Sequence, residues 1–138
     1  MVDALKEIWR ALKPAGILID LRPRAAKLPL DILYKNDVTP AGWVDDSRDQ
    51  ADDIAADKAM AKTVSQGYFV LERKATFSYL MYWDALEELT MYVTDRWRSA
   101  QLDETTVDNT RRLLVERGPA AKLRTHREMR IARYHKRS

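Results

Sequence analysis

Hydrophobic residues recur along the chain with periods that predict both helices and strands. Residues 2–12 place apolar side chains at helical spacing, and Lys13-Pro14 ends this helix because the residue before a proline is disfavoured in the α region. Residues 17–21 then form a nearly continuous apolar run, which is typical of a strand covered on both faces. Residues 69–83 alternate apolar and polar positions, so they predict one long strand or two strands joined by a bend.

Shorter patterns predict the other strands. Residues 29–34 and 42–44 indicate two short strands joined by a loop over residues 35–40. Residues 122–134 indicate the last strand, which we expect to lie beside residues 17–21.

Capping signals predict three further helices. Ser47, with Gln50 three residues later, has the form of a capping box, and its helix is expected to end near residue 65. Asp84 is the expected N-cap of the next helix, and residues 103–117 predict the last helix. The first of these three helices has only a thin apolar stripe, made by Ala51, Ile54, Ala55, Ala61 and Val64.

These elements together predict an α+β fold. We expect a small mixed β-sheet with helices packed mainly on one face. A chain of 138 residues is long enough for a proper core and fits a single domain, residues 1–138.

Composition excludes several classes of function. The chain has no cysteine, which excludes disulfides and thiolate chemistry. It has two histidines, and the aspartates near residue 50 lack the glycine and final glutamate of a calcium loop, so we predict no metal site. No apolar run approaches the roughly 18 residues that cross a membrane, and we expect a soluble cytoplasmic protein.

Charge is distributed unevenly. Residues 31–60 hold eight aspartates against three basic residues, and residues 120–138 hold seven basic residues against one glutamate. This division indicates either contact between the two regions or a polar partner surface. The basic residues could also neutralise nucleic-acid phosphates, although a solvated strand edge explains them as well. The candidates for nucleic-acid binding are Lys122, Arg124, Arg127, Arg130 and Arg133.

One small group of charges lies at the end of the first predicted strand. Asp20, Arg22 and Arg24 stand there, and in α/β proteins the ends of buried strands often carry ligand-binding groups. An arginine can clamp a carboxylate or phosphate, so these three residues are candidate ligand-binding residues. The alternative is an Asp–Arg pair that only fixes the loop. No spacing supports a catalytic triad or a carboxylate pair, and the catalytic residues stay unknown.

The stretch EIWRALKPAGILIDLRP, residues 7–23, resembles the helix, turn and strand near the fifth strand of class I S-adenosylmethionine-dependent methyltransferases. Leu12, Lys13, Pro14 and Gly16 match that family's Leu-Lys-Pro-Gly-Gly pattern, and Ala15 replaces its first glycine. The resemblance implies that the chain looks like the C-terminal half of such a Rossmann-like enzyme. Residues 69–83 and 122–134 would then be its closing antiparallel pair.

The cofactor-binding half of that family has no counterpart in this sequence. A Gly-rich turn after the first strand lets the backbone approach the cofactor, and none of the four glycines here stands in a Gly-x-Gly run. We therefore expect no cofactor, with S-adenosylmethionine bound only if another half completes the site.

Three functions remain open. The first is a non-catalytic interaction or assembly module, and the second is part of a methyltransferase completed by a separate N-terminal half. Nucleic-acid binding is third. The first two share one expectation, namely that the second edge of strand 17–21 lacks a partner within the chain. A second copy related by a two-fold axis, or the separate half, would cover this edge. If residues 29–46 of the same chain covered this edge, pairing with a partner there would be excluded.

Overall fold

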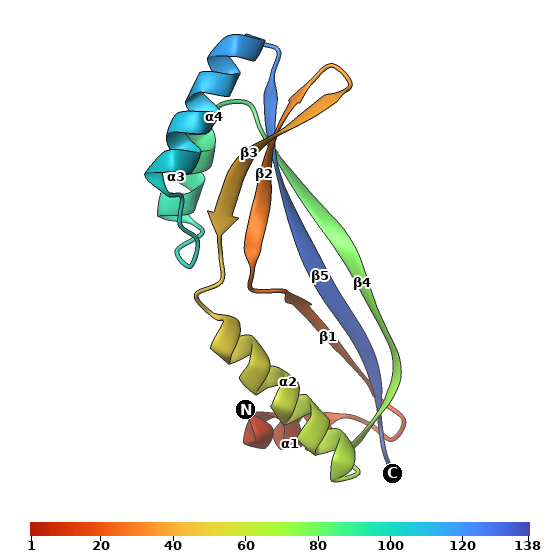
Figure 1. Cartoon of the computed structure of the whole chain (residues 1–138). Helices are drawn as coiled ribbons and strands as arrows, with labels where there is room; N and C mark the ends of the chain where they lie inside the picture. The colour runs from red at the N-terminus through yellow and green to blue at the C-terminus, as the bar shows by residue number, and fades with distance from the viewer. The chain divides into compact units, whose positions relative to one another are not determined.

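The computed structural model describes residues 1–138 and contains four helices and a five-stranded sheet (Figure 1). The helices are α1 (Val2–Ala11), α2 (Gln50–Ser65), α3 (Leu86–Asp95) and α4 (Glu104–Arg117). The strands are β1 (Ile17–Pro23), β2 (Lys27–Tyr34), β3 (Asp37–Asp45), β4 (Phe69–Trp83) and β5 (Lys122–Lys136). The expected α+β fold is confirmed, and the sheet is antiparallel rather than a combination of parallel and antiparallel pairs.

The chain folds as two compact units, each built from separate stretches. The first unit comprises Met1–Arg24, Gln50–Phe77 and Glu128–Ser138, and the second comprises Ala25–Asp49 and Ser78–Arg127. Strands β4 and β5 continue from one unit into the other. That the whole chain is a single domain stays a prediction. No helix is long and apolar enough to cross a lipid bilayer.

Strand β5 lies between β1 and β4 in the first unit (Figure 1). It pairs with β1 in antiparallel register, from Ile17 opposite His135 to Pro23 opposite Met129. The predicted neighbourhood of residues 17–21 and the C-terminal strand is therefore confirmed.

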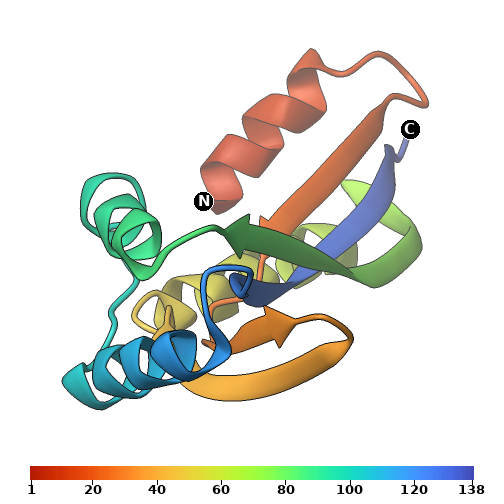
Figure 2. The ribbon, with the colours of Figure 1, turned by 90° about the horizontal axis from the view of Figure 1, so that it is seen from above.

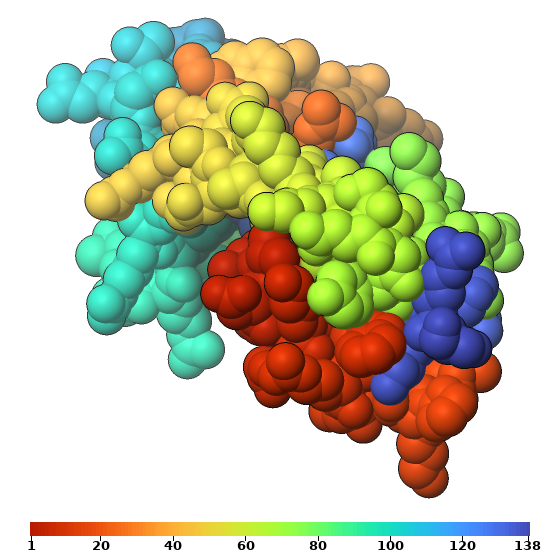
Figure 3. Space-filling model, turned by 90° about the horizontal axis from the view of Figure 1, so that it is seen from below, coloured from red at the N-terminus to blue at the C-terminus, as the bar shows by residue number.

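Helices α1 and α2 cover one face of these strands. Leu5 of α1 and Met60 of α2 bury their side chains with Phe69 and Tyr134. The two helices also pack against each other, and the red atoms of α1 lie against the yellow-green atoms of α2 in Figure 3. The opposite face of β1 carries exposed apolar side chains, so the prediction that this strand is covered on both faces is wrong.

Helix α2 differs from its prediction at its start and on its buried face. The Ser47 hydroxyl donates to the Asp45 carboxylate, with 2.6 Å between Oγ and Oδ1, so Ser47 does not cap the helix, which begins at Gln50. Its buried side chains are Ala56, Ala59, Met60 and Thr63. The predicted stripe was therefore misplaced, and Ile54 is 49% exposed.

The predicted cap of α3 is wrong, and α4 begins one residue later than predicted. The Asp84 carboxylate accepts from the Lys122 ammonium at 2.7 Å instead of capping α3, whose N-cap is Ala85. Asp103, the predicted first residue of α4, is its N-cap, and its carboxylate accepts from the Thr106 N–H at 2.6 Å.

Strands β2 and β3 form a tight hairpin in the second unit, which Figure 2 shows as the orange and gold strands. Tyr34 lies opposite Asp37, so the predicted loop over residues 35–40 is wrong and most of it belongs to β3. The pairing jumps from Gly42 to Pro40, which leaves Ala41 as the extra residue of a β-bulge. Only Lys35 and Asn36 form the turn, and Pro40 lies next to the bulge within β3.

The hairpin pairs with β5 through β2, with Leu30 opposite Thr125, and not with β1. Residues 29–46 therefore do not cover the edge of β1, which was the outcome that would have excluded a partner there. In the second unit the buried side chains of β2 and β5 pack against α3 and α4. This core includes Leu28, Leu30, Ile32, Leu123, Leu86, Leu89 and Leu113.

Gly42 allows α4 to approach β3 closely. Its φ is +148°, and a Cβ at this position would lie 2.4 Å from Oγ1 of Thr106. Thr106 is buried, so it has little room to move away. A side chain at position 42 therefore meets both backbone strain and a steric clash.

We predict that Gly42→Ala destabilises the protein by about 2 kcal/mol or more, through this strain and clash. Urea unfolding of the single variants Gly42→Ala and Thr106→Ala and of the double variant measures it. The double variant should lose less stability than the sum of the singles, since Thr106→Ala removes the clashing hydroxyl and methyl. Additivity to within about 0.5 kcal/mol would contradict the close contact.

Candidate functional site

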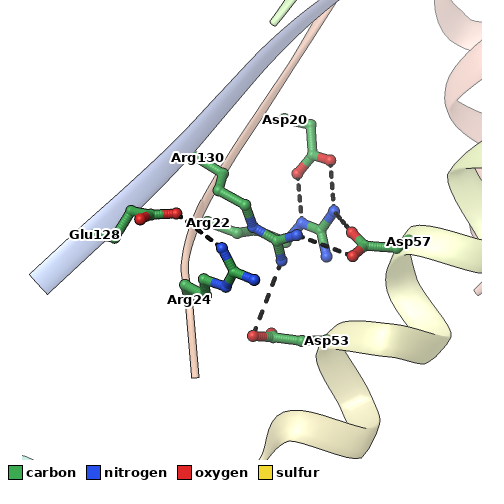
Figure 4. Close-up of polar contacts among 7 residues, drawn as sticks. All are labelled: Asp20, Arg22, Arg24, Asp53, Asp57, Glu128 and Arg130. Atoms are coloured by element: carbon green, nitrogen blue, oxygen red, sulfur yellow. Dashed lines mark hydrogen bonds and ion pairs between the residues drawn. The ribbon is translucent and has the colours of Figure 1, made fainter. Parts of the chain in front are cut away.

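Four charged side chains form a network between the sheet and α2 in the first unit, and Asp53 of α2 lies beside them, 3.9 Å from Nη2 of Arg130 (Figure 4). The Arg22 guanidinium holds both oxygens of Asp20, with Nε–Oδ1 at 2.8 Å and Nη2–Oδ2 at 2.9 Å. The same Nη2 donates to Asp57 of α2 at 2.7 Å. Arg130 of β5 reaches the other oxygen of Asp57 at 2.9 Å. The result is a chain of alternating charges that ties β1, β5 and α2 together.

The structure brings together two of the three candidate ligand-binding residues. Asp20 and Arg22 are two apart in β1, so they point to the same side of the strand, toward α2. Arg24 takes no part in these bonds and pairs instead with Glu128, at 3.1 Å between Nη1 and Oε1 (Figure 4). The Asp–Arg pair that the sequence offered as an alternative is present.

Two members of the network were not predicted as ligand-binding residues. Arg130 lies directly opposite Arg22 in the antiparallel register, and Asp57 reaches both arginines from α2. Knowledge of the β1–β5 register would have predicted this contact, because the register places Arg22 and Arg130 side by side.

The charges in the network fix one another's protonation state. The hydrogen bond to Asp20 raises the pKa of Arg22, and this outweighs the opposing effect of burial. Burial alone would raise the pKa of Asp57, but the hydrogen bonds from Arg130 and Arg22 outweigh it and hold that pKa below its usual 3.8. Arg22 and Asp57 therefore both favour their charged forms at neutral pH.

A cavity of about 800 Å³ lies beside this network, and we call it the α2 pocket. Helix α2 forms one wall, β4 forms another, and the floor is made by β5 and β1. Its polar lining includes Asp20, Arg22, Asp57, Arg130, Lys74 and Tyr134. Its apolar lining includes Met60, Ala61, Val64, Leu71, Ala75 and Ala132. The volume lies within the range of small-molecule sites.

The five basic residues predicted to bind nucleic acid all have acidic partners. The pairs are Lys122–Asp84, Arg124–Asp31, Arg127–Asp46, Arg130–Asp57 and Arg133–Glu72. Asp31, Asp46 and Asp57 come from the acidic region of residues 31–60, so the predicted contact between the acidic and basic regions is confirmed. Phosphate binding by these residues stays a prediction, and their observed role is to hold β5 to its neighbours.

The outer edge of β1 is unpaired, and its hydrogen-bonding groups can be assigned. The Lys136 N–H donates to Gly16 C=O at 2.8 Å, and the Arg24 N–H donates to Glu128 C=O at 3.0 Å. In an antiparallel pair such bonded positions alternate, so the even-numbered residues of β1 bond to β5. The N–H and C=O groups of Ile17, Ile19 and Leu21 therefore point outward, and the protein offers them no partner.

The side chains of the same three residues are also exposed. Ile17, Ile19 and Leu21 show 44%, 52% and 51% of their surface to solvent. They lie on the face of β1 opposite to Asp20 and Arg22, as the period of a strand requires. Free backbone groups and free apolar side chains thus coincide at one strand edge.

Comparisons with protein-family models, with curated proteins and with solved structures find no match for this chain. The structure contains no group of three or more side chains suited to hold a metal ion. The edge of β1 and the α2 pocket are therefore the two candidate functional features of the protein.

We predict that Asp57→Asn destabilises the protein at pH 7 by about 0.5–1 kcal/mol, the range of a partly exposed ion pair. The pKa of Asp57 is lowered in the fold, so its contribution is present above 3.8 and is lost as pH falls through the folded-state pKa.

Urea unfolding of both proteins between pH 7 and pH 2 measures this difference. Asp95→Asn is the matched control, because Asp95 is exposed and forms no ion pair. A stability difference for Asp57→Asn that does not shrink at low pH would contradict the assignment.

Proposed function

We propose that this protein is a non-catalytic assembly module that joins a second copy of itself through the edge of β1. The proposal rests on Ile17, Ile19 and Leu21, the alternate residues of β1 whose backbone groups and side chains are exposed. Each offers an N–H, a C=O and an apolar side chain along one unpaired edge. A strand added along this edge would bond the N–H and C=O groups and would cover the apolar side chains.

Proline selects the register of the pairing. Two β1 strands related by a two-fold axis pair antiparallel, and their outward residues form the hydrogen-bonded pairs. With Ile19 facing Ile19 of the second copy, Ile17 faces Leu21, and Pro23, which lacks an N–H, stays outside the paired segment. Every outward N–H from Ile17 to Leu21 then meets a carbonyl, and the apolar side chains form one continuous strip.

The other open edges are protected against such pairing along part of their length. β3 carries Pro40 and the bulge at Ala41, both of which interrupt a ladder. β4 carries Glu72, Arg73 and Lys74 near its start, and charges discourage edge pairing there. Residues 75–82 of β4 carry no charge and expose Phe77 and Tyr79, so this strand is protected only in part. We propose β1 because its outward backbone groups and its exposed apolar side chains belong to the same three residues.

The methyltransferase resemblance supports a second candidate for the same edge. The order of β1, β5 and β4, with β1 outermost, suits a chain whose β1 continues into the sheet of a separate N-terminal half. S-adenosylmethionine would then bind only to the completed pair. A monomeric wild-type chain would favour this candidate over self-association.

We predict that the wild-type chain forms a dimer with a Kd in the micromolar range, as suits a small interface. Ile19→Lys should weaken this dimer at least about tenfold, because two like charges would then face each other at the two-fold axis. Sedimentation equilibrium over a concentration series measures the Kd, and circular dichroism confirms that the variants fold.

Ile54→Lys is the matched control. Ile54 is 49% exposed, close to the 52% of Ile19, but it lies on α2 away from any strand edge. This variant should dimerise like the wild type. A wild-type chain that stays monomeric at about 100 μM, well above a micromolar Kd, or equal losses in the two variants, would overturn the proposal.

A further inference from the structure

The α2 pocket has the shape and lining of a small-molecule site that the assembly function does not use. Small side chains keep it open, since Ala61, Ala75 and Ala132 stand where larger residues would fill the space. Met60 and Val64 of α2 and Leu71 of β4 add apolar surface along the same walls. An apolar group of a ligand would be shielded from water along these residues.

The polar end of the pocket offers donors rather than acceptors. Both oxygens of Asp20 and both oxygens of Asp57 are already held by arginines. Nη1 of Arg22 and Nε of Arg130 have no hydrogen-bond partner, but both atoms are buried away from solvent. Arg130 also lies 3.9 Å from the Asp53 carboxylate, so both arginines have acidic partners and Lys74 is the basic group of the lining without one.

Two hydrogen-bond donors of the pocket lining are available to a ligand. The Lys74 ammonium lines the pocket from β4 and forms no ion pair within the protein. The Tyr134 hydroxyl also has no partner, although the residue is buried. Burial raises the pKa of Tyr134, and the Asp20 charge raises it further, so this hydroxyl keeps its proton at neutral pH and can donate.

We infer that the α2 pocket binds a small monocarboxylate with an unbranched apolar body. The carboxylate accepts hydrogen bonds from Tyr134 and Lys74 and supplies the acidic partner that Lys74 lacks. The apolar body lies along Met60, Val64 and Leu71. A cation of the same length would meet the Lys74 ammonium and would find the carboxylates of Asp20 and Asp57 already held by arginines, so the site discriminates by the sign of the ligand's charge.

Octanoate and octylammonium, which share their chain length and differ in charge, test this inference. Isothermal titration should show octanoate binding with a Kd below about 1 mM and octylammonium binding at least about tenfold more weakly. Chemical-shift changes should fall on the methyl groups of Met60, Ala61 and Ala132. Equal binding of both probes, or no octanoate binding at about 1 mM, would overturn the inference.

Matched variants distinguish binding in the α2 pocket from a general effect of protein charge on octanoate affinity. Lys74→Glu should weaken octanoate binding at least about tenfold, and Tyr134→Phe should weaken it several-fold while keeping the ring. Lys62→Glu makes the same charge change on the exposed side of α2, outside the pocket lining, and should leave binding unchanged. Equal losses in Lys62→Glu and Lys74→Glu would contradict the site.

The monomeric Ile19→Lys variant keeps this test independent of the proposed assembly. Its substitution lies on the face of β1 opposite to the pocket, so it should bind octanoate as the wild type does. Failure of dimerisation would therefore leave the pocket inference standing, and failure of octanoate binding would leave the assembly proposal standing.

Discussion

The antiparallel pairing of β5 with its neighbours is the interaction on which the rest of the structure depends. β5 pairs with β1 in the first unit and with β2 in the second, and β4 runs along it. Its backbone register decides which side chains of the flanking strands meet. Its arginines and Lys122 then bond to acidic residues that the register and the helices bring within reach. Backbone geometry and charge pairing thus reinforce each other on one strand.

The same register explains why the pocket and the open edge occur on one strand. Even-numbered residues of β1 bond to β5, and their side chains, Asp20 and Arg22, turn toward α2 and the α2 pocket. The odd-numbered residues turn both their backbone groups and their apolar side chains outward. A shift of one residue would reverse both assignments, since the side-chain period of a strand is two. The α2 pocket and the open edge of β1 are therefore two consequences of one pairing.

Much of the fold could be predicted from local signals, because these signals act within a few residues. The bounds of β4 and the cap of α4 at Asp103 follow from alternation and from a side chain beside its own helix. The cap predictions failed where another residue competed for the side chain that was expected to cap a helix. Ser47 donates to Asp45 instead of capping α2, and Asp84 binds Lys122 from another strand. Such competition depends on tertiary contacts, which a local pattern does not contain.

The candidate site was only half predictable for the same reason. Asp20 and Arg22 are close in sequence, and their spacing already places them on one side of a strand. Arg130 and Asp57 join them through register and helix packing across more than 30 residues of sequence, as the Arg22–Asp57 bond shows with a separation of 35. The apolar run at residues 17–21 indicated a strand but not its exposure, because an edge that awaits a partner has the same composition as a buried strand.

Amide hydrogen exchange of β1, followed by NMR at several protein concentrations, tests the central claim most directly. In dilute solution the account predicts slow exchange at Leu18, Asp20 and Arg22 and fast exchange at Ile17, Ile19 and Leu21. As concentration rises, the three odd-numbered amides should become protected, because a second β1 strand then accepts their hydrogen bonds. Odd-numbered amides that exchange fast at every concentration, or that stay protected at high dilution, would contradict pairing of two copies through this edge.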